Sequence, residues 1–144
     1  MKKLLLAVLF CALSPSVFAV CQIQMVYQRG PAEDLLKRHW NEFNVPDYDS
    51  MCLKLQRANA AIEIAADAKV LAGTSIGFAR LRVVDRSSGL GTIDYTNGHI
   101  RTDPYASQDE ADKLMLLAVQ DSLNDWTHFD GAVASLVAAR KSLR

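Results

Sequence analysis

The chain has 144 residues, half of them hydrophobic, and its 16 lysine and arginine residues balance its 16 aspartate and glutamate residues. A chain of this length suits one domain. The lack of a basic excess argues against nucleic acid or an anionic membrane surface as the partner.

The N-terminus has the pattern of an export signal. Two lysines follow Met1, an apolar run covers 4–13, and Ala19 ends a short polar-to-small stretch that suits cleavage. About ten apolar residues are too few to cross a bilayer. We therefore expect a signal peptide over 1–19, cleaved after Ala19, and a single periplasmic domain over 20–144 with no membrane span.

Two cysteines, Cys21 and Cys52, remain after the signal is removed. In an oxidising compartment they are expected to form one disulfide, worth on the order of 3–4 kcal/mol in the chain-entropy model. Lipidation of Cys21 is disfavoured because Val20 is a poor fit before a lipidated cysteine. The sequence has no CxxC pair and no histidine cluster, so we expect neither a metal nor a cofactor.

The first half of the domain is predicted to contain a strand and two helices. Residues 21–28 alternate between polar and apolar, which is typical of a half-buried strand. Helical spacing follows over about 31–43, and a long helix is predicted over about 48–72, because alanine is enriched and Gly73 suits the end of a helix. The alternation within residues 59–66 also fits a strand, so the sequence leaves both a helix and a strand possible for that segment.

Residues 76–103 are predicted to form a meander of three strands. Asn97-Gly98 is the strongest hairpin signal, because a type I′ turn needs positive φ at both central residues. The register that such a turn fixes joins Thr96 with His99, Tyr95 with Ile100, Asp94 with Arg101, and Ile93 with Thr102. Side chains alternate along each strand, so the meander should have an apolar face and an arginine-rich outer face.

The last part of the chain is predicted to be helical. Ser107 and Glu110 have the spacing of a capping box, which opens a helix over about 108–126. A final helix is expected over about 132–143. The element order is then β-α-α-β-β-β-α-α. It defines an α+β fold in which helices pack on one face of a small antiparallel sheet of three to four strands.

The outer face of the meander is the candidate binding surface. It is formed by Arg80, Arg82, Asp94, Thr96, His99 and Arg101. Cross-strand charge pairing on a solvated face would explain this group. Recognition of a partner would also explain it, because arginine is enriched at interfaces and pairs bidentately with carboxylates.

Motifs for catalysis are absent from the sequence: it has no GxSxG, P-loop or HExxH pattern. We therefore expect a non-enzymatic protein that binds another protein of the bacterial envelope. An inhibitor or immunity protein that neutralises a toxin or hydrolase fits best, and a second copy of the chain is an alternative partner.

Two other functions stay open. A small hydrolase or isomerase would use His99 with Asp94 or Asp103 in a cleft. An envelope-assembly or lipid-binding protein would need a large apolar cavity under the helices.

Overall fold

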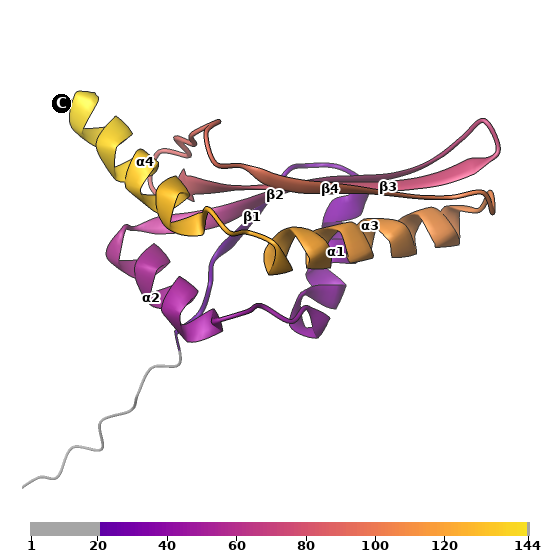
Figure 1. Ribbon diagram of the computed structural model, residues 1–144, viewed down its shortest axis with the longest axis horizontal. Coiled ribbons are helices and arrows are strands. Elements are labelled where there is room, and N and C mark those ends of the chain that lie inside the picture. The colour runs from indigo at the N-terminus through magenta and orange to yellow at the C-terminus, as the bar shows by residue number, and fades with distance from the viewer. Residues whose placement is uncertain (1–20, 144) are drawn as a thin grey trace, which may run out of the picture.

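A four-stranded sheet with helices packed against it makes up the computed structural model, which describes residues 21–143 (Figure 1). The expected signal peptide lies outside the described residues. The elements in chain order are β1 (Met25–Tyr27), α1 (Ala32–His39), the 3-10 turn η1 (Trp40–Glu42), α2 (Tyr48–Arg57), β2 (Ala60–Leu71), β3 (Thr74–Asp85), β4 (Asn97–Asp103), α3 (Gln108–Asn124) and α4 (Phe129–Ser142). The predicted α+β class and element order are confirmed.

The sheet is mixed, whereas the sequence predicted an antiparallel one. Its strand order is β1-β2-β3-β4, and β2, β3 and β4 pair antiparallel with one another. β1 pairs parallel with β2, with Met25 opposite Ile62. The reason is the connection: α1 and α2 form a crossover between the two strands, which returns the chain in the same direction.

The core lies between the sheet and α3. Ile62 and Ile64 of β2 and Leu81 of β3 point to the helix side, where they meet Met115 and other buried residues. Burial of each such side chain stabilises the folded state by roughly 1.5–3 kcal/mol. α3 runs beneath the strands in Figure 1, and this packing fixes which side of the sheet is covered.

The α3 backbone approaches the sheet most closely at Gly77. A Cβ built on Gly77 would lie 2.1 Å from the backbone nitrogen of Met115. No side chain can occupy that space, so the glycine is what allows the helix to lie so close to β3.

Residues 60–71 form strand β2, so the predicted helix over 48–72 is wrong in its second half. α2 ends at Arg57, and Asn59 has a positive φ of 46° that redirects the chain. Ile62 then faces the core while Glu63 faces the other side. Pairing with β1 and β3 outweighs the helix propensity of the alanines, which is a weak preference.

The β2–β3 hairpin turns at Ala72 and Gly73, where the sequence predicts the end of a helix. Leu71 pairs with Thr74, and the two residues between them have φ values of 50° and 80°. Positive φ at both positions is the arrangement of a type I′ turn. Alanine is an unfavourable choice at the first of them.

We expect Ala72→Asn to raise the free energy of unfolding by about 0.5–1 kcal/mol, because asparagine tolerates the left-handed region better than alanine. Urea denaturation of the two proteins measures the difference. Gly73→Ala is the matched control and should be destabilising. Equal or lower stability of Ala72→Asn would show that the turn is not strained at this position.

Asn97-Gly98 is not a turn, and the register predicted around it is wrong. Both residues lie at the start of β4, and the loop over 86–96 connects β3 to β4. The Asn97 side chain donates a hydrogen bond to the Ser122 carbonyl of α3 at 2.6 Å. A Cβ on Gly98 would lie 2.8 Å from the Ala79 carbonyl oxygen, so this glycine serves close strand pairing.

The loop residues expected in a strand are therefore exposed. Ile93 is 83% exposed, and Tyr95 has a positive φ of 61°. The Tyr95 carbonyl accepts a hydrogen bond from the Trp126 indole at 3.0 Å. That contact holds the end of the loop against the segment between α3 and α4.

The helices at the C-terminus follow the predicted pattern with shifted bounds. Ser107 caps α3 as expected, accepting a hydrogen bond from the Glu110 backbone at 3.1 Å. α4 begins at Phe129, before the predicted start at 132. Arg140 near its end binds the Asn59 carbonyl at 2.9 Å and forms an ion pair with Asp85.

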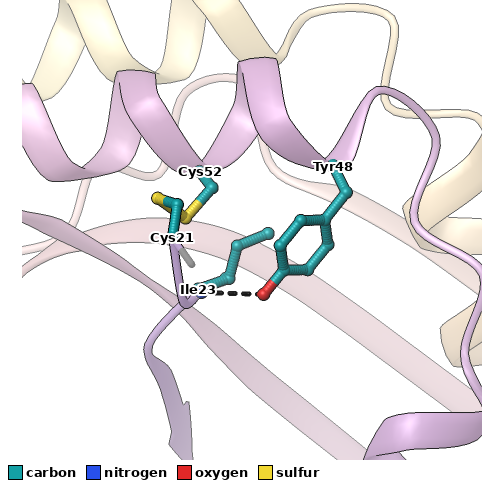
Figure 2. The surroundings of a disulfide bond; sticks show 4 residues. All are labelled: Cys21, Ile23, Tyr48 and Cys52. Atoms are coloured by element: carbon teal, nitrogen blue, oxygen red, sulfur yellow. Dashed lines mark hydrogen bonds between the residues drawn. A yellow bond between two sulfur atoms is a disulfide. The ribbon is translucent and has the colours of Figure 1, made fainter. Parts of the chain in front are cut away.

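The predicted disulfide between Cys21 and Cys52 is present (Figure 2). It joins the segment before β1 to α2, with the two Cα atoms 6.0 Å apart, and Cys52 is 1% exposed. Nearby, the Ile23 backbone donates a hydrogen bond to the Tyr48 hydroxyl at 3.1 Å (Figure 2). The bridge thus fixes the edge strand of the sheet to a helix.

Candidate functional site

One face of the sheet is left open. Figure 1 shows α1, α2 and α3 on the same side of the strands. The strand register sets three cross-strand rows on the opposite face: Glu63 with Arg82, Ala65 with Arg80 and Gly98, and Asp67 with Phe78 and Ile100. We call the surface that these residues form the open face. Its far end, at Val84, lies against the loop over 86–96.

A shallow trough of about 700 Å³ crosses the open face. Its middle row is low because Ala65 and Gly98 carry little or no side chain beside Arg80. Phe78 and Ile100 line it on one side. The remaining lining residues that matter here are Gln28 and Arg29 at the β1 end and Thr96 and His99 at the β4 end.

The row beside the trough holds a partly buried ion pair between Glu63 and Arg82. Arg82 donates two hydrogen bonds to Glu63, at 3.0 and 2.9 Å, and the Gln28 amide donates a third at 3.0 Å. Burial raises the pKa of the Glu63 carboxyl, but the hydrogen bonds from Arg82 and Gln28 outweigh it. The pKa therefore lies below its ordinary value of 4.5.

We expect the Glu63 pair to make stability fall in acid. The pKa of Glu63 is lower in the folded state than in the unfolded state. The stability that this difference provides is complete at a pH above the pKa of the unfolded state, and it is lost as the pH falls through the pKa of the folded state. Between about pH 5 and pH 3 the free energy of unfolding should fall by on the order of 1 kcal/mol more in the wild type than in Glu63→Gln. Urea denaturation across this range measures it. Glu33→Gln, in an exposed helical pair with Lys37, is the control, and an identical acid response of all three proteins would contradict the account.

Arg80 and Arg29 give the trough a surplus of positive charge. Within residues 21–143 neither side chain forms an ion pair, whereas Glu63 is already bound by Arg82 and Asp67 by Lys69 at 2.7 Å. Arg80 also lowers the pKa of Glu63 through its charge. The open face thus presents arginine next to exposed apolar side chains.

The six residues predicted to share one surface are divided among three places. Arg80 and Arg82 lie on the open face, as expected. Thr96 lies at the β4 end of the trough. His99 also borders the trough, but it pairs with Ala79, so its side chain lies on the covered side of the sheet, contrary to the prediction. Asp94 lies in the loop over 86–96.

Arg101 faces α3, so the predicted pair with Asp94 is wrong. Its Nε donates to Asp121 Oδ2 at 2.5 Å. This hydrogen bond, more than the charge itself, holds the pKa of Asp121 below its usual range. The physical reason is the β4 register, in which Arg101 pairs with Gly77 on the covered side of the sheet.

His99 lies beside a carboxylate other than the two expected. Its Nε2 is 3.5 Å from Asp125 Oδ2. Asp103 instead accepts a hydrogen bond from the Tyr105 backbone at 2.7 Å. The structure therefore does not bring together the residues on which the catalytic alternative was based.

Sequence reasoning missed much of the trough, namely Gln28, Arg29, Ala65, Phe78 and Ile100. Ala65 was missed because the alanine-rich composition of its segment predicts a helix. The alternation over 60–71 was the available signal: read as a strand, it places Glu63, Ala65 and Asp67 on one face.

The fold and the site define an α+β domain with one sheet face covered by helices and one open. No protein-family model matches the chain, and no curated protein matches it. Among solved structures, the chain is similar to a "putative lipoprotein" from Caulobacter crescentus CB15, with 13% identity, a TM-score of 0.33, and coverage of 85% of this chain and 92% of that one. A similarity of this degree says nothing about function. Within residues 21–143, no helix is long and apolar enough to cross a membrane.

Proposed function

We propose that this protein is an exported, non-enzymatic domain that binds another protein of the bacterial envelope through its open face. An inhibitor or immunity protein that neutralises a toxin or hydrolase is the specific role. The observation that carries the proposal is the trough, where Arg80 and Arg29, which form no ion pair within residues 21–143, lie beside exposed apolar side chains of the sheet.

The composition of the open face is that of an interface. Ile100 is 73% exposed and Phe78 36% exposed, and Arg80 lies in the row between Phe78 and Arg82. Aromatic residues and arginine are enriched at protein interfaces and supply most of their binding energy. An isolated exposed apolar residue needs no explanation, but here such residues adjoin the trough and Arg80, which has no ion-pair partner in the described part of the chain.

The scaffold supports binding without rearrangement. β2 and β3 are each twelve residues long and lie on a packed core, so a partner would not have to order them. Binding to strands that are already ordered avoids the entropy cost of ordering them, which favours affinity. Export is supported by the disulfide, because such bonds persist in oxidising compartments.

The test is affinity capture from an envelope extract with the mature domain over 20–144 as bait. Ala65→Tyr fills the trough, and Leu117→Tyr places the same side chain on the exposed side of α3. We expect one protein to be retained by the wild type and by Leu117→Tyr but lost with Ala65→Tyr. The retained protein should be a toxin or hydrolase, and its purified activity should fall on addition of wild type alone. Equal retention by both variants, or no retained protein, would overturn the proposal.

A further inference from the structure

We infer that the trough binds an acidic segment of its protein partner, whose carboxylates pair with Arg80 and Arg29 while an apolar side chain lies against Phe78 and Ile100. This inference rests on the proposed function and specifies the chemistry of the partner. Three features of the open face carry it.

Charge is the first feature. Arg82 and Glu63 neutralise each other, and so do Lys69 and Asp67. Within the described chain, Arg80 and Arg29 keep their charges without a carboxylate. A partner that supplies two negative charges is therefore complementary, and complementary charge favours both encounter and correct register.

The space around Arg80 is the second feature. Its cross-strand neighbours are Ala65 on one side and Gly98 on the other, and neither has a side chain that can accept a hydrogen bond. The guanidinium is planar and presents paired donors, which suits bidentate binding of a carboxylate. The small neighbours leave room for that carboxylate to approach.

The third feature is the apolar wall. Phe78 and Ile100 are cross-strand partners in the row next to Arg80. A segment that carries acidic and apolar residues in turn would cover both rows at once. A second copy of the chain is disfavoured as occupant, because a two-fold contact through this face would bring Arg80 against the same cationic patch.

The probe is a capped nine-residue peptide of three Glu-Leu-Ser repeats, and its control has glutamine in place of glutamate. Arginine Nε–H signals of the mature protein are followed by NMR during titration. We expect the Glu peptide to shift the Arg80 and Arg29 signals saturably. The affinity should fall by about ten- to a hundredfold in Arg80→Gln and remain reduced in Arg80→Lys. Arg38→Gln, on an exposed part of α1, is the matched control and should bind like the wild type.

Several outcomes would overturn the inference: equal binding of the two peptides, shifts confined to other arginines, or dimerisation of the protein that Ala65→Tyr abolishes. Capture of the partner separates this inference from the proposed function. If the Arg29→Gln/Arg80→Gln variant retains the partner and Ala65→Tyr loses it, the acidic chemistry is wrong but the open face is still the interface. If both variants retain it, the proposed function fails as well.

Discussion

Gly77→Ala is expected to lower the free energy of unfolding by about 3 kcal/mol or more, at the upper end of what overpacking costs. The added Cβ would lie 2.1 Å from the Met115 nitrogen and 2.3 Å from the Leu114 carbonyl carbon. Both are backbone atoms, so no side-chain rotation relieves the contact. α3 would have to move away from the sheet, and the core beneath it would open.

Urea denaturation monitored by circular dichroism measures the effect of this change. Gly30→Ala is the matched control, because a Cβ there meets nothing within 4 Å. Its unfolding free energy should stay within about 0.5 kcal/mol of the wild type. Equal stability of the two variants would mean that α3 does not lie against β3 as described.

Removing the disulfide with Cys21→Ser/Cys52→Ser is expected to lower the free energy of unfolding by about 3–4 kcal/mol. The two cysteines are 31 residues apart, so the bridge restricts a long loop in the unfolded chain. It also holds β1, a strand of only three residues, at the edge of the sheet.

Denaturant unfolding with and without reductant tests the disulfide prediction. Reduced wild type should match the double variant, and reductant should not change the double variant. If oxidised wild type and the double variant unfold at the same denaturant concentration, the bridge is absent or contributes nothing.

The sequence predicted the parts of the fold that depend on local chemistry. The capping pattern at Ser107 located α3 correctly, and the pairing of Cys21 with Cys52 was predicted from their number and the expected export of the chain. Arg80 and Arg82 were correctly placed on a face away from the helices by simple alternation.

The failures came where contacts distant in sequence decide the structure. The alanines before Gly73 favour a helix locally, yet their segment is held between two strands. Asn97-Gly98 has the composition of a turn, but Asn97 is bound to α3 and Gly98 lets two strands approach. In both cases a partner that the sequence does not reveal outweighed a local preference.

The candidate site was predicted only in part for the same reason. The turn predicted at Asn97-Gly98 does not exist, and it led to the assignment of His99 and Arg101 to the wrong face of the sheet. Side chains alternate along a strand, so a register shift of one residue moves every side chain to the opposite face. The trough itself depends on Ala65 and Gly98, small residues that become informative only once they are known to flank Arg80.

The central claim is that the open face, and not the helix face, contacts the partner. Photo-crosslinking in cells tests it most directly, with benzoylphenylalanine replacing Phe78 on β3 or Leu117 on α3, both of which are exposed. We predict a covalent adduct with a single envelope protein from position 78 and none from position 117. An adduct from position 117 alone, or from neither position, would contradict the account.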